Sequence, residues 1–238
     1  MHKTSKVIFL ISMCLLGVIF FYTERHSVES IDLNIVEKTS AQTKNESGPV
    51  KMLFVGDIML DRVVAINSER KGVDSLFYKI RDLLTSSDLT VGNLEGPITD
   101  EPSIAQKDFS ILRFTFDRKF AHVLKDYGFS ALSLANNHSM DFGQNGYDQT
   151  THYLEDAGIY FFGSYLNNKN ISTSIRIREK NVCLVGYHDL YTHDPVSTTA
   201  EIVRIRSNCD YIVLFAHWGE EYQKIQSDRQ TELAHGFV

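Results

Sequence analysis

The sequence predicts an α/β fold with a layered β-sheet core flanked by helices. From Val50 onward, short apolar runs typical of buried strands alternate with stretches of helical periodicity. In addition, polar side chains of metal-ligand type follow four of the predicted strands. Strands that are apolar throughout belong to sheets covered on both faces. The length of 238 residues, with 43% hydrophobic and 23% charged residues, fits one such domain with additional segments.

The first half of the domain contains three predicted core strands and two predicted helices. Core strands are predicted at 51–56, 88–93 and 129–135, and a short strand at 113–116. Apolar residues at helical spacing predict a helix over 74–85. A second helix, over 118–127, ends before Gly128, a residue type that favours helix ends.

The second half continues the alternation. A helix is predicted over 145–157, ending before Gly158, and a strand over 159–163. A pair of strands is predicted at 171–177 and 182–187, followed by a helix at 199–207, a buried strand at 211–216 and a helix at 229–238.

The N-terminal segment predicts a membrane anchor. Residues 1–6 are a short basic start, which we expect in the cytoplasm, and the uncharged run Val7–Tyr22 is roughly 24 Å long as a helix. We therefore expect a transmembrane helix over 7–23, joined by a polar linker, residues 24–49, to the domain at 50–238. Bulky residues end the run where a signal-peptide cleavage site needs small ones, which favours an uncleaved anchor over a cleaved signal peptide.

The charge pattern predicts where the domain lies and which partners it has. Basic residues precede the apolar run, which predicts a single-pass protein of the cell membrane with its domain on the extracytoplasmic side. The formal net charge of −6 argues against nucleic acid as a partner, because duplex binding needs a basic face.

The three cysteines have no zinc-finger spacing. Cys14 lies in the apolar run, Cys183 in a strand pattern and Cys209 before another strand. Two interpretations remain open for the last two: a disulfide, if the domain is outside the cytoplasm, or two buried free thiols. The free thiols are favoured because buried free cysteine is common.

Candidate site residues follow the core strands. Asp57 and Asp61 follow the first strand, Asn93 and Glu95 the second, Asn136, Asn137 and His138 the third, and His217 the last. Each alone has an ordinary explanation, such as a helix N-cap, a turn residue or a packed core histidine. Ligands bind beyond the carboxyl ends of strands in open α/β sheets, so the coincidence of all four favours a functional site.

The chemistry of these side chains predicts a metal site. A mixed oxygen and imidazole set suits divalent Mn, Fe or Zn rather than a thiolate site. Two such ions could share a carboxylate and clamp a phosphoester or similar group. A histidine beside a ligand asparagine could protonate a leaving group.

Four strings together resemble the CapA/PgsA capsule-synthesis (poly-γ-glutamate) family of calcineurin-like metallophosphoesterases. They are GDIMLDR (56–62), GNLEGPIT (92–99), LANNHSMDFG (134–143) and AHWGEEY (216–222), and the resemblance covers 50–238. It implies a metallophosphoesterase-like core with up to two divalent metal ions. It implies metal ligation by Asp57, Glu95 (in place of the bridging carboxylate), Asn137 and His217, an acid or transition-state role for His138, and supporting roles for Asp61 and Asn93.

Two departures qualify the resemblance. Metallophosphoesterases usually open with Asp-x-His, and here this motif is Asp57-Ile58-Met59, so the histidine ligand is absent. The capsule-synthesis family shares this absence. A final His-x-His-type motif is expected shortly after Val238, so we expect a C-terminally incomplete domain whose first-metal site lacks ligands.

The resemblance implies a role in the biosynthesis of a poly-γ-glutamate-type capsule polymer. The implied partners are the membrane, an extracellular anionic polymer and other membrane subunits of a capsule synthase. The alternatives are a non-catalytic anchoring component of such a complex and a general metal-dependent phosphoesterase. Whether the chain is an enzyme is left open at this stage.

Overall fold

The computed structural model describes residues 48–191 and 195–238, all within one compact unit, Gly48–Val238. The predicted transmembrane helix at 7–23, the basic start and nearly all of the linker lie outside the described residues. Within the described part, no helix is long and apolar enough to cross a membrane.

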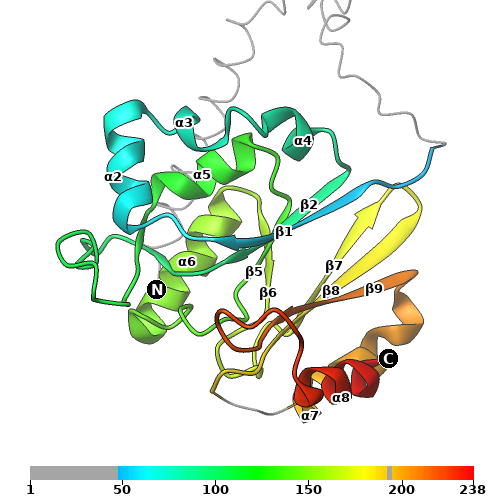
Figure 1. Cartoon of the computed structure of the whole chain (residues 1–238). Helices are drawn as coiled ribbons and strands as arrows, with labels where there is room; N and C mark the ends of the chain where they lie inside the picture. The colour runs from blue at the N-terminus through cyan, green and yellow to red at the C-terminus, as the bar shows by residue number, and fades with distance from the viewer. Residues whose placement is uncertain (1–47, 192–194) are drawn as a thin grey trace, which may run out of the picture. The chain divides into compact units, whose positions relative to one another are not determined.

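The larger sheet consists of four parallel strands in the order β1-β2-β5-β6. These strands are β1 (Met52–Ile58), β2 (Leu89–Leu94), β5 (Ala131–Ser133) and β6 (Tyr160–Phe162). The connecting helices are α2 (Arg62–Lys71), α3 (Asp74–Phe77), α4 (Arg81–Thr85), α5 (Lys119–Asp126) and α6 (Gly143–Asp156), and they gather on one side of this sheet (Figure 1). A small parallel pair, β3 (Ile98–Thr99) and β4 (Phe116–Asp117), lies between β2 and α5 in the chain.

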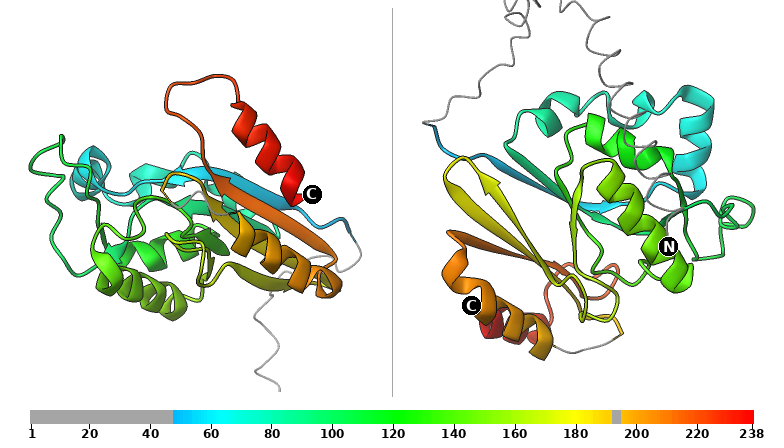
Figure 2. Two further views of the ribbon diagram at one scale, coloured as in Figure 1. Left: turned by 90° about the horizontal axis from the view of Figure 1, so that it is seen from below. Right: turned by 180° about the vertical axis from the view of Figure 1, so that it is seen from behind.

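The second sheet has three strands in the order β7-β8-β9. β7 (Ser172–Ile177) and β8 (Lys180–His188) are antiparallel, whereas β9 (Tyr211–His217) runs parallel to β8. Helix α7 (Val196–Ile205), the 3-10 turn η2 (Arg206–Asn208) and helix α8 (Asp228–Phe237) complete the fold. Both α7 and α8 lie at the end of the molecule remote from α2–α6 (Figure 2).

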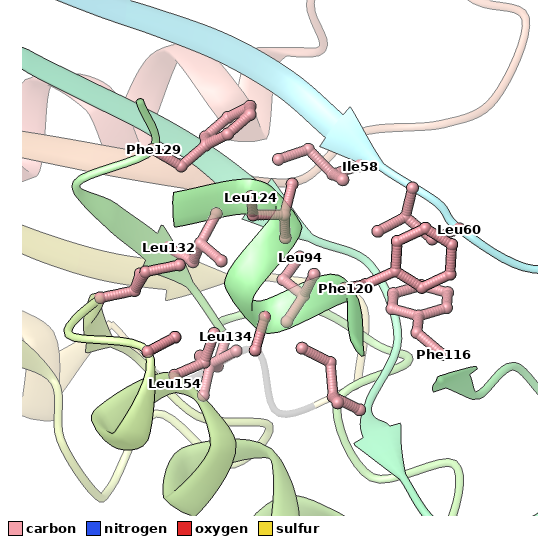
Figure 3. Packing of buried hydrophobic residues seen from close by; sticks show 14 of the residues in the cluster. Ile58, Leu60, Leu94, Phe116, Phe120, Leu124, Phe129, Leu132, Leu134 and Leu154 are labelled. Atoms are coloured by element: carbon pink, nitrogen blue, oxygen red, sulfur yellow. The ribbon is translucent and has the colours of Figure 1, made fainter. Parts of the chain in front are cut away.

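Three apolar clusters define the layers. The first joins the helices to the larger sheet, and Leu124 of α5 and Leu154 of α6 face Ile58, Leu94 and Leu132 there (Figure 3). The second fills the space between the two sheets and includes Leu89, Val91, Val182 and Leu184. The third lies on the outer face of the smaller sheet and includes Cys183, Val185 and Ile205. Alternation along β8 sends successive side chains to opposite faces, which explains how one strand serves two clusters.

The predicted α/β class with a sheet core flanked by helices is confirmed, and most predicted elements form within a few residues of their expected bounds. The helix predicted over 74–85 is wrong as a single element, because Ile80 has a non-helical backbone (φ −115, ψ 5) and separates α3 from α4. Phe77 explains the interruption, since it turns inward to pack on Tyr127 and Phe129, with ring centroids 5.0 and 6.3 Å away.

Helix α2 was not predicted from the sequence. Its buried residues are only Ala65 and Ser68, so it lacks a clear apolar stripe. Asp61 begins it by accepting a hydrogen bond from the Arg62 N–H.

The preference for free thiols at Cys183 and Cys209 was wrong, because the two residues form a disulfide with their Cα atoms 5.8 Å apart. Cys183 points outward from β8, and Cys209 ends the η2 turn just before the neighbouring strand β9. The parallel pairing of β8 with β9 brings them together, and the spacing in the sequence did not reveal that pairing.

The disulfide closes a loop with a sequence separation of 26 residues, which is expected to stabilise the fold by about 3.5 kcal/mol through restriction of the unfolded chain. We expect Cys209→Ser to lower the free energy of unfolding of the full chain by a comparable amount in urea titrations. Reducing agent should destabilise the wild type and leave the variant unchanged. Equal stability of oxidised and reduced wild-type protein would contradict the prediction.

Candidate functional site

The carboxyl ends of β1, β2 and β5 meet at one edge of the larger sheet. In the parallel register, Asp57 is level with Asn93, and Asn93 is level with Ser133, just before the Asn136–His138 turn. β1 has an irregular register between Phe54 and Asp57. The strand β9 of the other sheet ends at His217, and side-chain contacts join this residue to the same edge.

His217 lies between two oxygen donors. Its Nε2 is 2.9 Å from Oδ1 of Asn137, and its Nδ1 is 3.4 Å from Oδ1 of Asp57. The imidazole is largely buried (17% exposed), whereas the Asp57 side chain is half exposed (51%). Two of the predicted metal ligands, Asp57 and Asn137, therefore contact a third, His217, although the three come from three different strand ends.

The buried side chain of Asn93 contacts both Asp57 and His217. Its Nδ2 donates to Oδ1 of Asp57 at 2.8 Å and lies 3.2 Å from Nδ1 of His217. Its Oδ1 accepts a hydrogen bond of 2.9 Å from Nδ2 of Asn136. An amide suits this position because it offers a donor and an acceptor at once.

Asn136 extends the network to the histidine that follows it. Its Nδ2 also donates to the Leu94 carbonyl at 2.9 Å, and its Oδ1 accepts from the His138 N–H at 3.0 Å. The buried Asn93–Asn136 pair therefore ties the end of β2 to the turn after β5. The sequence placed Asn136 among the strand-end candidates, but the family resemblance gave it no role.

Glu95 follows β2 at a turn that requires glycine at the next position. Gly96 has φ +149, and a Cβ there would lie 2.7 Å from the Phe116 ring. The Glu95 N–H donates to the Ile58 carbonyl at 3.1 Å, which holds the turn against β1.

The two carboxyl groups of the site have opposite pKa shifts. Burial, and then the negative charge of Asp57, raise the pKa of Glu95. The hydrogen bond from His217 lowers the pKa of Asp57. The charges of Asp57, His217 and His138 all act on the pKa of Glu95, so these three side chains lie near the Glu95 carboxyl group.

Sequence reasoning missed one residue beside the candidate acid His138. Oδ2 of Asp141 lies 2.9 Å from Nδ1 of His138 and also accepts the Phe114 N–H at 2.7 Å. The Phe114 ring packs on the imidazole with centroids 4.4 Å apart. The spacing of three residues between His138 and Asp141 was visible in the sequence, but only the turn conformation makes the two side chains meet. This carboxylate fixes which imidazole nitrogen faces the site.

In the described part of the chain, the buried carboxylate of Asp61 binds neighbouring segments and not the candidate site. It is fully buried and accepts hydrogen bonds from Ser103 Oγ, Gln106 Nε2 and the Thr115 N–H, in addition to the Arg62 N–H. Among residues 48–191 and 195–238, none of its hydrogen bonds reaches Asp57, Glu95 or His217. It anchors the 100–115 segment to the start of α2.

The donor set contains amides as well as charged groups. In the part of the chain that the structure describes, no three side chains of the His, Cys, Asp and Glu types converge as a metal site. The converging group consists of Asp57 and His217 together with Asn93 and Asn137, with Glu95 nearby.

Comparison with known families assigns the domain. The sequence model described as "Bacterial capsule synthesis protein PGA_cap" matches residues 51–238. The chain belongs to this bacterial capsule synthesis family. All candidate site residues, from Asp57 to His217, fall within the matched region.

Two relatives of the chain are named for capsule or PGA biosynthesis. The "PGA biosynthesis protein CapA" of Bacillus subtilis (strain 168) is 30% identical over 198 residues, covering 76% of this chain and 52% of that protein. The "Capsule biosynthesis protein CapA" of Bacillus anthracis is 27% identical over 214 residues, covering 81% and 52%. The chain thus spans about half the length of the curated relatives it matches.

Solved structures show more distant similarity. A hypothetical protein from Thermus thermophilus aligns with a TM-score of 0.48 and 17% identity, covering 79% of this chain and 63% of that chain. A structure described as a novel phosphatase from Mycoplasma pneumoniae has a TM-score of 0.46 and 13% identity, covering 80% and 60%.

The contact between Asp141 and His138 predicts a defined imidazole tautomer, with the proton on Nδ1. We expect ¹⁵N NMR spectra of the full chain, labelled at histidine, to show the Nδ1–H form for neutral His138. In Asp141→Asn the side-chain amide can donate instead of accept, so the population should move toward the Nε2–H form. The exposed residue His122, which faces Asp156, serves as the internal control and should not change. An unchanged His138 tautomer in the variant would contradict this positioning.

Proposed function

We propose that this chain acts in the biosynthesis of a bacterial capsule polymer of the poly-γ-glutamate type, as a membrane-anchored protein with a metallophosphoesterase-like site. The observation that carries the proposal is the contact of Asp57 and Asn137 with the two ring nitrogens of His217, because it joins three strand ends at one edge. Family membership and the capsule biosynthesis names of two relatives support the biological role.

The chemistry of the donor set fits one or two divalent ions such as Mn, Fe or Zn. Carboxylate, amide oxygen and imidazole are ligands for such ions, and here they lie within hydrogen-bonding reach of one another. The residues that would hold the ions are Asp57, Glu95, Asn137 and His217, with Asn93 orienting Asp57. When bound, the ions would supply positive charge that polarises a phosphoester or similar linkage.

Within this proposal, His138 handles a proton. Asp141 holds its Nδ1, so Nε2 is the nitrogen available to a leaving group or to substrate oxygen. The Phe114 ring covers one side of the imidazole and limits access of water. His138 is the group proposed to act on the substrate, and Asp141 orients it.

The disulfide supports the proposed extracytoplasmic location of the domain. Disulfides persist in oxidising compartments and are rare in the bacterial cytoplasm. The proposed partners follow from this location: the membrane through residues 7–23, an extracellular anionic polymer and other membrane subunits of a capsule synthase.

Metal binding by the full chain in detergent tests the proposed site. We expect Mn²⁺ and Zn²⁺ affinities, measured by competition with a chromophoric chelator, to fall at least tenfold in Asp57→Asn, which removes a negative charge from a ligand, and in His217→Ala, which removes a ligand nitrogen. His122→Ala is the matched control, because it removes an exposed imidazole outside the site and should bind as the wild type does. Equal affinities in all four proteins would overturn the metal assignment.

A second candidate is a non-catalytic component of a capsule synthase. It is favoured by the finding that, among the described residues, no three His, Cys, Asp or Glu side chains converge as a metal site. In a strain lacking the native gene, Asp57→Asn and His217→Ala at wild-type protein levels should then restore capsule, whereas removal of residues 7–22 should not. Loss of capsule in the site variants would support the first candidate.

A further inference from the structure

Arg113 is an exposed arginine whose guanidinium is held by a hydrogen bond and by an aromatic ring. Its Nε donates to the main-chain carbonyl of Asp141 at 2.7 Å, and its guanidinium carbon lies 4.2 Å from the centre of the Phe142 ring. A cation on an aromatic face is attracted to the ring, so the plane of the guanidinium is fixed before any ligand arrives.

The terminal amino groups of Arg113 have no acceptor among the described residues. Its only hydrogen bond there uses Nε, and no carboxylate lies within salt-bridge distance. Other arginines in the same part of the chain have acidic partners: Arg118 with Asp100, Arg178 with Asp88, Arg204 with Glu201 and Arg229 with Asp189. Arg113 has no acidic partner there, so both of its Nη groups remain available to a ligand.

The position of Arg113 is set by the residues around His138. The carbonyl of Asp141 binds Arg113, while the carboxylate of the same residue binds His138. Phe114, the next residue after Arg113, packs on the His138 ring. The guanidinium thus lies against the turn that follows His138, and two residues that contact His138, Phe114 and Asp141, are its direct neighbours.

The charges within the site are otherwise mainly acidic. Asp57, Glu95 and Glu221 bring three carboxyl groups to this edge. A cationic side chain near His138 would offset their repulsion of an anionic group that approaches the site. A guanidinium binds carboxylate or phosphate oxygens in pairs through its planar fork, and one that is already fixed loses less conformational freedom on binding.

We propose that Arg113 binds an anionic group of the substrate, a carboxylate or phosphate, and positions it beside His138. This assignment rests on the proposed function for the location of the chemistry, but the binding itself needs no turnover. The competing explanation is that Arg113 only fastens the 109–114 segment to the turn at Asp141–Phe142. The two explanations differ in whether the Nη groups bind an added anion.

The experiment uses the full chain, labelled with ¹⁵N-arginine and free of metal, with inorganic phosphate and glutarate as separate probes. We expect the Nε–Hε signal of Arg113, assigned by its loss in Arg113→Gln, to shift saturably with at least one probe, and less at high salt. The signal of Arg118, an exposed arginine 3.7 Å from Asp100, should stay in place. A larger affinity for phosphate indicates a phosphoester group, and a larger affinity for glutarate indicates a carboxylate polymer.

Variants separate binding from fastening. Anion affinity, measured by ³¹P shift or saturation-transfer NMR, should fall at least fivefold in Arg113→Gln, fall partially in Arg113→Lys, and stay unchanged in Arg118→Gln. We expect the anion affinity to persist in Asp57→Asn, which would show that anion binding at Arg113 does not depend on the proposed metal site. An Arg113 signal that does not respond in the wild type, or equal affinity in Arg113→Gln, would overturn the proposal, even where the variant is less stable.

Discussion

The side-chain amide of Asn93 is the contact on which the geometry of the site depends. It is almost fully buried (1% exposed) and joins the ends of β1 and β2, the turn after β5 and the end of β9 through Asp57, Asn136 and His217. A carboxylate at this position could not donate to Asp57 and would add a second negative charge beside it. A neutral amide satisfies both neighbours, and buried polar networks that are fully satisfied fix a single arrangement.

The position of His217 depends on the strand next to its own. The Asp189 N–H donates to the His217 carbonyl at 3.2 Å, where β8 and β9 end together. Asp189 in turn accepts from Tyr187 at 2.6 Å and from two nitrogens of Arg229 at 2.5 and 2.7 Å. Helix α8, which carries Arg229, is thereby fastened to the end of β8. The imidazole of the site is thus supported by groups on two elements that do not themselves reach the site.

The sequence predicted the strand-end groups because strand periodicity and ligand-type residues are both local patterns. Asp57, Asn93, Asn137 and His217 could each be placed at the end of an apolar run, and the parallel sheet then brought the first three together. Contacts that depend on pairing between distant segments were not predictable in this way. The disulfide of Cys183 with Cys209 requires the β8–β9 register, and the burial of Asp61 requires the 100–115 segment to fold over α2. Helix α2 was missed because most of its surface is polar.

The two carboxyl groups at this edge are made different by their surroundings. Hydrogen bonding to His217 holds the pKa of Asp57 below its usual range, so its carboxylate is charged over the whole neutral range. Burial and the charge of Asp57 raise the pKa of Glu95, so Glu95 is the group of the pair that takes up a proton first as the pH falls. Environments that separate the pKa values of two neighbouring acids are a recurrent way of assigning them different roles. Here the separation arises from one imidazole and one half-buried turn, and both are positioned by the strand ends that the buried amides connect.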